Sequence, residues 1–434
     1  MARGKKGAQG LTPEEKLAQA LVPMEEQPYQ IPENWCWVRL LNVANLYNGD
    51  RGKNYPSKKD YQITGIPFIN AGALVDGQLE PKEFNYISEE KYNALSAGKI
   101  QCGDILYCLR GSLGKSAIVE IEGNGAISSS LCILRCTKAI DNRFLFFLLN
   151  SDIIKKQQDS AENGSAQPNL SAASVIKYMV PLPSILEQQR IVDRIESIFA
   201  KLDEAKEKAQ AVVDGFELRK SAILHKAVTG ELTEKWRETE AIKNQWEIKK
   251  FRNFCLLKRG YDLPASQRIK GVYPLVSSSG VIDAHCEYKV KGPGVITGRS
   301  GTIGKVFIVN EDYWPLNTTL YSENLFGNDP FYVYYYLQTF DFKTYSSSTA
   351  VPTLNRNMFL DVEVSVPTLK EQAEIVRILD KLLAKENAAK EAAESVLDQI
   401  DTMKKAVLAR AFRGELGTND PAEESAVELL KSGL

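Results

Sequence analysis

One short run of the sequence could bind a nucleotide phosphate, Gly111-Ser112-Leu113-Gly114-Lys115-Ser116. A P-loop ends in this way but requires a glycine five positions before its last one, and Leu109 stands there. A second copy, from Gly301 to Lys305, fails likewise, with Arg299 at that position and Val306 in place of the magnesium-binding hydroxyl. We therefore expect a tight turn between strands whose backbone amides and basic residues lie near a polyanion. A turn with merely solvated basic residues is the alternative.

Other catalytic motifs are incomplete. Asn328-Asp329-Pro330-Phe331 lacks the double proline of the amino-methyltransferase tetrad and has no glycine-rich cofactor motif beside it, so we expect the start of a helix. The two histidines, His225 and His285, do not lie in a nucleophile-like context. Cys132 and Cys136 lack histidines at metal-ligand spacing, which favours buried free thiols. The sequence predicts no catalytic residue, no metal and no cofactor bound by this chain.

The composition is that of a globular protein with two or three domains, at 434 residues, 44% hydrophobic and 25% charged. The net charge is −1, so binding to nucleic acid must depend on local clusters of basic residues. Seven cysteines without paired spacing favour a reducing compartment. We expect a cytoplasmic protein, because neither a signal peptide nor a long apolar run is recognisable.

The sequence elements that must position any site occur twice in the chain. Glu187-Gln188 returns as Glu371-Gln372, and Gly230-Glu231-Leu232 returns as Gly414-Glu415-Leu416, a spacing of 184 residues in both cases. The segment between the two motifs has therefore kept its length, which a helix in fixed register requires and a loop does not. The preceding segments match more faintly, with drifting offsets, so each half combines a variable globular part with a helical part.

Each helical part carries apolar residues at alternating steps of four and three, the seam of a coiled coil. We expect two helices of about 40 residues, about 60 Å long, which pack antiparallel with the globular parts at opposite ends. Gly230 and Gly414 would end them. Glu386 interrupts the second seam; we expect its stem to pack and its carboxylate to reach water, and a role in fixing register is the alternative. The main seam residues are Ile191, Ile195, Leu202, Phe216, Ile375, Leu379, Leu382, Val396, Ile400 and Val407, and Met403 continues the second series.

The globular parts combine strand-like runs with short helices, so we predict an α/β (α+β) class. A capped helix is expected from Pro13 to Leu21, and amphipathic helices from Phe144 to Lys155 and from Phe331 to Thr339. A base-stacking role for the aromatic run 331–336 is less favoured, because its match at 144–149 has no hydroxyls. The predicted domains are an N-terminal helical segment (1–27), a first globular domain (28–182), a first spacer helix region (183–232), a second globular domain (233–366), a second spacer helix region (367–416) and a C-terminal tail (417–434).

Polar and cationic loop residues recur in both halves. Sequence-specific DNA recognition needs cations for phosphates and side-chain hydrogen bonds for base edges. Each residue alone is more often simply solvated, but the repeated set favours DNA binding. The candidates are Lys53, Asn54, Lys58, Lys59, Arg110, Ser112, Lys115, Ser129 and Asn169 in the first half, and Lys258, Arg259, Tyr261, Arg268, Ser278, Arg299, Ser300, Thr302, Lys305, Thr318 and Ser347 in the second.

The paired motifs Glu187-Gln188-Gln189-Arg190-Ile191-Val192 and Lys226-Ala227-Val228-Thr229-Gly230-Glu231-Leu232, with their second copies, resemble the specificity subunit of Type I restriction–modification systems over essentially the whole chain. The resemblance implies two target recognition domains that read a bipartite, asymmetric site in double-stranded DNA, with the helices setting the gap between its halves. It implies two modification subunits, which methylate adenine with S-adenosylmethionine, and a restriction subunit that uses ATP and Mg. This chain itself would be non-catalytic.

Two other classes remain open. One is a coiled-coil adaptor that binds only proteins, and the other is a fused restriction–methylation enzyme, which the missing cofactor motif disfavours. The sequence does not define the target bases or the gap between half-sites.

Overall fold

The computed structural model describes residues 12–161, 169–241, 246–346 and 352–431. The chain forms two compact units, residues 1–207 together with 397–434, and residues 208–396. Each combines mixed sheets with helices, so the fold is α+β. Among the described residues no helix combines the length and the apolar character needed to cross a membrane.

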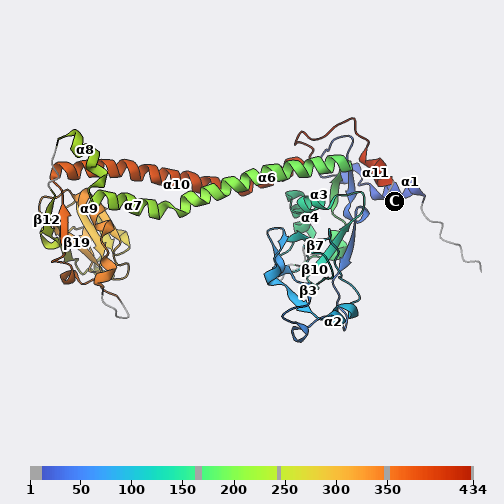
Figure 1. Cartoon of the computed structure of the whole chain (residues 1–434), viewed down its shortest axis with the longest axis horizontal. Helices are drawn as coiled ribbons and strands as arrows, with labels where there is room; N and C mark the ends of the chain where they lie inside the picture. The colour runs from blue at the N-terminus through green and yellow to red at the C-terminus, as the bar shows by residue number, and fades with distance from the viewer. Residues whose placement is uncertain (1–11, 162–168, 242–245, 347–351, 432–434) are drawn as a thin grey trace, which may run out of the picture. The chain divides into compact units, whose positions relative to one another are not determined.

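The first unit is built around a four-stranded antiparallel sheet in the order β2-β10-β7-β8, on which α3 and α4 lie (Figure 1). A three-stranded sheet, β6-β3-β9, and the pairs β1-β11 and β4-β5 complete it. Its elements are α1 (Pro13–Ala20), β1 (Cys36–Arg39), β2 (Ala44–Asn48), β3 (Ile66–Ile69), β4 (Leu74–Val75), β5 (Gln78–Leu79), β6 (Asn85–Ile87), α2 (Glu89–Ala94), β7 (Ile105–Cys108), β8 (Ser116–Ile118), β9 (Ala126–Ile127), β10 (Leu131–Cys136), α3 (Asn142–Leu149), α4 (Asp152–Ala161), α5 (Ala172–Val175), β11 (Met179–Leu182) and α11 (Ala426–Lys431).

The second unit repeats this plan. Its sheets have the orders β13-β19-β16-β17, β15-β14-β18 and β12-β20. In both three-stranded sheets the central strand has one antiparallel and one parallel neighbour, β6 and β9 beside β3, and β15 and β18 beside β14. The elements are α8 (Glu234–Thr239), β12 (Glu247–Lys250), β13 (Leu256–Arg259), β14 (Lys270–Ser277), β15 (Gly280–His285), β16 (Gly294–Gly298), β17 (Val306–Val309), β18 (Trp314–Pro315), β19 (Thr319–Asn324), α9 (Pro330–Thr339) and β20 (Glu363–Val366). The internal repeat predicted from the motifs is thus a repeat of topology.

Several predicted helix starts are confirmed. Thr12 and Glu15 form a capping box at the start of α1. Asp329 is the N-cap of α9, where its side chain accepts from two backbone N–H groups, so the tetrad-like run there begins a helix. Tyr332 on α9 and Phe144 on α3 are buried in their units' cores, which confirms packed helices in place of a base-stacking platform. The range predicted as helical from Phe144 to Lys155 is, however, divided between α3 and α4, with a break at Asn150 and Ser151.

The helical parts are α6 (Ile185–Asp214), α7 (Phe216–Val228) and α10 (Leu369–Ala411). In the first unit Ile191 and Ile195 share a core with Leu408 and Phe412 near the end of α10. In the second, α7 packs on the start of α10, where Leu224 and Ala227 share a core with Ile375 and Leu379. Helix pairing is therefore antiparallel within each unit. Gly230 and Gly414 have φ of 82° and 73°, as expected of glycines that end a helix.

One prediction about the helices is wrong: the first copy is not a continuous helix of about 40 residues. It breaks at Gly215, between α6 and α7, whereas α10 continues for 43 residues. Glycine is among the poorest helix formers, and a Cβ at Gly215 would lie 2.4 Å from Nη1 of Arg219 and 3.1 Å from the carbonyl oxygen of Ala211. The Arg219 side chain thus occupies the space that the missing side chain leaves.

The seam prediction is only partly right. Ile191, Ile195, Phe216, Ile375, Leu379 and Ile400 are buried, and Leu202, Leu382 and Val407 are half-buried. Val396 and Met403 are 41% and 45% exposed, so their predicted burial is wrong. They stand seven residues apart and so share one side of α10, which the narrow seam of a helix pair does not cover. The carboxylate of Glu386 does not simply reach water but pairs with Nε of Arg219 at 2.7 Å.

A buried glutamine ties each globular part to its helix. Oε1 of Gln188 accepts from the N–H of Asp141, the N-cap of α3, at 2.7 Å, and its Nε2 donates to Ala139 and Pro183 carbonyls. Gln372 does the same for α9, accepting from the N–H of Asp329 at 2.8 Å and donating to the carbonyl of Pro367. The repeated Glu-Gln motif is therefore a structural joint that fixes the domain's helix against the long helix.

Candidate nucleic-acid interface

Each unit carries the same glycine turn at the end of its central sheet. Gly111 and Gly114 join β7 to β8 with φ of 85° and 77°, and Gly301 and Gly304 join β16 to β17 with φ of 83° and 78°. These left-handed conformations favour glycine. The N–H of Gly114 donates to the carbonyl of Cys108 at 3.1 Å, and that of Gly304 to Gly298 at 3.3 Å. The predicted tight turn between strands is confirmed in both copies.

A segment distant in sequence returns to lie beside each turn. Arg110 and Asn169 form an isolated β-bridge, and Leu170 donates to the carbonyl of Leu109 at 2.9 Å. In the second unit Ser300 bridges Thr353, and the N–H of Leu354 donates to the carbonyl of Arg299 at 2.8 Å. The backbone scaffold is thus the same in both units, while the side chains on it differ.

In the first unit the turn residues Arg110, Ser112 and Lys115 are exposed, as is Asn169. The serine run preceding β10 lies beside them in the fold, since Leu109 donates to the carbonyl of Ser130 at 2.8 Å. Ser129 donates through its N–H to the hydroxyl of Tyr55 at 3.3 Å. Tyr55 was not predicted from the sequence. The feature that could have identified it is its position as an aromatic residue inside the basic loop 51–59.

The basic loop of the first unit is organised by Asp50, which the sequence also did not single out. Its carboxylate accepts from the N–H groups of Gly52 at 2.6 Å and Ser96 at 2.7 Å. These backbone hydrogen bonds, that from Gly52 first, lower the pKa of Asp50. Lys53, Lys58 and Lys59 are exposed on the loop, and no carboxylate of the described chain lies within ion-pair distance of them. Asn54 instead donates to the carbonyl of Ala94 at 2.9 Å, a structural contact.

In the second unit several candidates meet at the turn. Ser278 donates through its N–H to the hydroxyl of Thr318 at 3.3 Å, and Lys305 donates to the carbonyl of Ser279 at 3.3 Å. Arg299 is half-buried; burial first, and then the charge of Arg259, lower the pKa of its guanidinium. Ser300 and Thr302 complete this group on the turn itself, and Thr302 is exposed. The structure therefore brings together Arg259, Ser278, Arg299, Ser300, Thr302, Lys305 and Thr318.

Other candidates of the second unit are held by the protein. Lys258 pairs with Glu323 at 2.6 Å, the Tyr261 ring stacks on Tyr321 with centroids 5.9 Å apart, and Nε of Arg268 donates to the carbonyl of Leu263 at 3.3 Å. Their contact with DNA stays a prediction. Ser347 lies outside the described residues.

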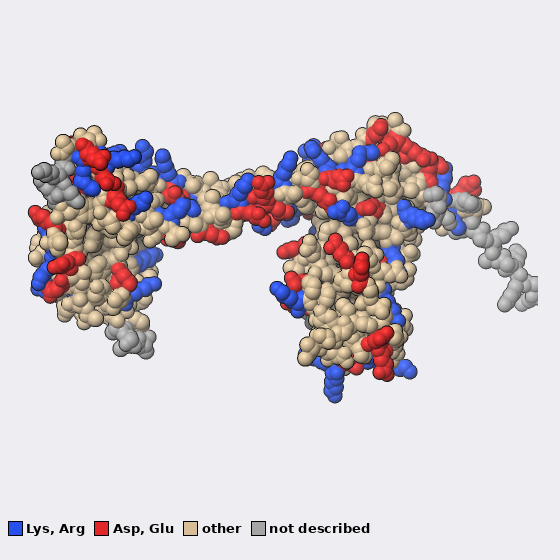
Figure 2. Space-filling model, in the orientation of Figure 1, with Lys and Arg blue, Asp and Glu red and all other residues tan. Residues whose placement is uncertain are grey.

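The surface charge is mixed. On the face shown in Figure 2, Lys and Arg are interspersed with Asp and Glu over both units. A cation that protrudes from such a surface provides a local contact with a phosphate or a base and does not create a uniform positive field. This agrees with the net charge of −1.

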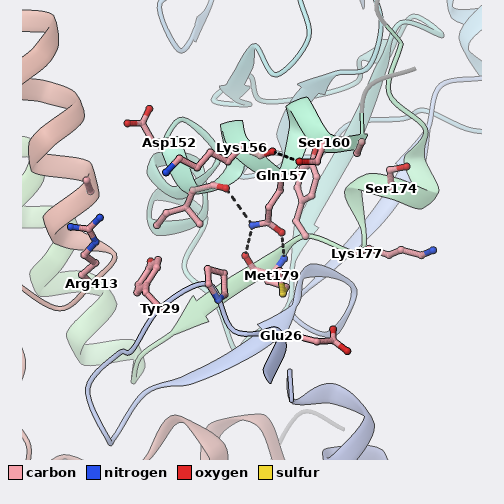
Figure 3. A pocket seen from close by; sticks show the side chains of 15 residues that line it. Glu26, Tyr29, Asp152, Lys156, Gln157, Ser160, Ser174, Lys177, Met179 and Arg413 are labelled. Carbon is pink, nitrogen blue, oxygen red and sulfur yellow. Dashed lines mark hydrogen bonds between the residues drawn. The ribbon is translucent and has the colours of Figure 1, made fainter. Parts of the chain in front are cut away.

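The first unit also contains a cavity of about 660 Å³ between α4, β11 and the end of α10 (Figure 3). Lys156, Lys177 and Arg413 contribute cations, and Glu26 and Asp152 contribute carboxylates. The carboxamide of Gln157 is engaged by backbone, since its Oε1 accepts from the N–H of Met179 at 2.7 Å and its Nε2 donates to the Met179 carbonyl at 3.0 Å. None of the turn residues lines this cavity, which is therefore separate from the candidate interface.

No group of three or more His, Cys, Asp or Glu side chains in the described part of the chain has the arrangement of a metal site. Cys132 is buried, and burial raises the pKa of its thiol. The predicted buried thiol is confirmed at this position, whereas Cys136, for which burial was also predicted, is half-buried.

Comparison with known proteins agrees with the repeated architecture. The family model described as the Type I restriction modification DNA specificity domain matches twice, at residues 32–213 and 243–397. The chain is 23% identical over 440 residues to the Type I restriction enzyme EcoKI specificity subunit of Escherichia coli K12, covering 91% of this chain and 92% of that protein. It is 22% identical to the StySPI specificity subunit of Salmonella potsdam, covering 91% and 92%.

Solved structures share the fold. The crystal structure of the HsdS subunit from Thermoanaerobacter tengcongensis superposes with a TM-score of 0.65 at 21% identity, covering 91% of this chain and all of that one. A chain from a structure described as the basis of complex assembly and conformational transition of the type I R-M system gives a TM-score of 0.67 at 21% identity, with 90% and 100% covered. The curated relatives are named as specificity subunits, and the twofold match of the family model shows that the chain belongs to the Type I restriction modification DNA specificity family.

Proposed function

We propose that this chain is the DNA-recognition subunit of a Type I restriction–modification complex and that each unit reads one half of a bipartite, asymmetric site in double-stranded DNA. The observation that carries the proposal is the repeated glycine turn. One backbone scaffold presents Arg110 and Asn169 in the first unit but Ser300 and Thr353 in the second. Equal scaffolds with different side chains are suited to reading two different sequences, because base edges are distinguished by side-chain donors and acceptors.

The partners follow from the same proposal. Two modification subunits would dock on the chain and methylate adenine with S-adenosylmethionine, and a restriction subunit would use ATP and Mg. The chain itself would bind none of these cofactors and would act in the cytoplasm. The long helices would set the number of unread base pairs between the half-sites, since their length is fixed by register.

The test is a selection from random DNA duplexes, followed by sequencing, with the chain assembled with its modification subunits. We expect enrichment of a sequence with two defined parts and a constant undefined gap. A chimera that exchanges residues 28–182 for those of a relative should change one part and leave the other part and the gap unaltered. Enrichment of no sequence at moderate salt would contradict the proposal and favour an adaptor that binds only proteins.

A further inference from the structure

Arg110 is an exposed arginine whose side chain is held by a neutral group. Its Nε donates to Oδ1 of Asn169 at 3.3 Å, and the backbones of the two residues form a β-bridge. Both side chains are exposed at the glycine turn of the first unit. With Nε engaged, the guanidinium plane is oriented. Among the described residues, the N–H groups of the terminal nitrogens Nη1 and Nη2 have no hydrogen-bond acceptor.

The backbone that carries Arg110 is fixed on both sides. The N–H of Leu109 donates to Ser130 at 2.8 Å, and the carbonyl of Leu109 accepts from Leu170 at 2.9 Å. The thiol of Cys108 donates to the carbonyl of Arg110 at 3.1 Å. Next to it, no atom of the described residues lies within 4 Å of the position where a Cβ of Gly111 would stand, so these residues leave the space beside the turn open. A side chain that reads a base must be held by a rigid backbone and must be accessible to the DNA, and Arg110 meets both conditions.

Two other arginines of the same unit are neutralised by carboxylates. Arg135 pairs with Asp104 at 2.7 Å, and Arg143 pairs with Glu196 at 2.6 Å. No carboxylate of the described residues lies within 4.0 Å of the Arg110 guanidinium. A free guanidinium with a fixed plane matches the two acceptors O6 and N7 that guanine presents in the major groove, and this bidentate pair is the commonest specific contact to DNA.

We propose that Arg110 reads a guanine in the half-site of the first unit and that Asn169 is the positioning residue that orients it. This inference rests on the function proposed above. Asn169 then differs from its predicted role as a direct DNA contact, because its Oδ1 is occupied by the arginine. The terminal nitrogens of Arg110 donate to O6 and N7, and no covalent step is involved.

The second unit lacks this device. Ser300 and Thr353 occupy the matching positions. Its arginine, Arg299, stands one residue earlier, at a bend directly after β16. Arg299 is half-buried and its Nη1 donates to the carbonyl of Asn317 at 3.4 Å. The guanine contact assigned to Arg110 is therefore expected in one half-site only.

The test uses the duplex selection with the chain assembled with its modification subunits, comparing wild type with Arg110→Lys, Arg110→Gln and Asn169→Ala. Lysine keeps the positive charge but lacks the planar guanidinium group. Both Arg110 variants should lower the preference for guanine at one position of one half-site by about 5- to 150-fold. Asn169→Ala should weaken the preference at that same position and no other, an effect that a loss of folding would not produce.

The matched control is Lys115→Gln on the same turn, since Lys115 is exposed and is expected to contact phosphate. It should weaken binding to all sequences alike and make the dependence of affinity on salt less steep. An unaltered second half-site in every variant shows that the complex is folded. The inference is overturned if wild type selects a split site and the Arg110 variants select the same bases. If wild type selects no split site, the proposed function itself fails.

Discussion

Thr418 donates its hydroxyl hydrogen to a carboxylate oxygen of Glu187 at 2.7 Å, across 231 residues of sequence. In the second unit Thr233 donates to Glu371 at 2.7 Å, across 138 residues. Glu187 and Glu371 open the two helical copies, whereas Thr233 and Thr418 follow their ends. Each unit is therefore closed by the start of one copy and the end of the other, as two antiparallel helices require.

Replacing Thr418 by valine should reduce the stability of the first unit by an amount that depends on pH. Burial raises the pKa of Glu187, while Thr418 and Arg190 lower it. Since the folded pKa lies above its ordinary value, ionisation of Glu187 costs stability as pH rises through that pKa. In Thr418→Val the ionised carboxylate loses a donor, so the loss of unfolding free energy should be largest at neutral pH and shrink under acid, where Glu187 is protonated.

The measurement is urea denaturation between pH 4 and pH 8 of wild type, Thr418→Val, Glu187→Gln and the double variant. In the Glu187→Gln background the valine substitution should lose its pH dependence. An equal effect of the valine substitution at all pH values in both backgrounds would refute the assigned role of Glu187.

Gln188→Ala should destabilise the first unit by about 1–3 kcal/mol, because it leaves a buried N–H and buried carbonyls without partners. The groups affected are the N–H of Asp141 and the carbonyls of Ala139 and Pro183. The neighbouring Gln189 is exposed, so Gln189→Ala is a matched control with little expected effect. Chemical denaturation measures both. Equal losses in the two variants would show that the buried carboxamide does not fasten α3 to α6.

The sequence predicted what depends on local chemistry. The turn glycines, the helix start at Asp329 and the helix ends at Gly230 and Gly414 each follow from a backbone conformation that one residue type prefers. The equal spacing of the Glu-Gln motifs predicted a repeat because the helix register fixes their positions. The structure shows what these motifs do: Gln188 accepts a hydrogen bond from the N–H of Asp141, and Gln372 accepts one from the N–H of Asp329.

Contacts between distant segments could not be predicted. Tyr55 reaches Ser129, and Asp50 reaches Ser96, only because separate strands bring their loops together. The break at Gly215 was missed because the apolar seam continues across it, and a helical seam tolerates an isolated glycine. The matching position of α10, 184 residues later, is Gln399, and there the helix continues.

The two glycines of the first turn should respond differently to alanine. Gly111 and Gly114 have φ of 85° and 77°, so each substitution should cost about 1–2 kcal/mol of backbone strain. A Cβ at Gly111 would meet no atom of the described residues within 4 Å, whereas one at Gly114 would lie 2.2 Å from Oε1 of Gln158. Gln158 is buried and accepts from the hydroxyl of Tyr107 at 3.2 Å.

Gly114→Ala should therefore cost about 1 kcal/mol more than Gly111→Ala, the size of one hydrogen bond. Thermal unfolding of the two variants side by side is sufficient, since each serves as the control of the other. A larger loss in Gly111→Ala would show that the turn is not built as described.

Asp50 holds the basic loop of the first unit in place. Its carboxylate accepts from the N–H of Gly52 and from both the N–H and the hydroxyl of Ser96, the latter at 2.8 Å. Asparagine offers a single acceptor oxygen in place of two, so Asp50→Asn should free the loop that carries Lys53, Lys58 and Lys59. Trypsin at pH 8 should cleave the variant faster between residues 51 and 59. Asp76 is an exposed aspartate whose carboxylate accepts no hydrogen bond from the described part of the chain, so Asp76→Asn should leave the cleavage rate unchanged.

The pH dependence has a defined sign. The backbone donors lower the pKa of Asp50, so the stability it contributes is present above the ordinary carboxyl pKa of about 3.9 and is lost as pH falls through the folded value. The difference in unfolding free energy between wild type and Asp50→Asn should accordingly be constant near neutrality and shrink in acid. A difference that instead grows as pH falls would mean that the Asp50 carboxylate is not held by these donors.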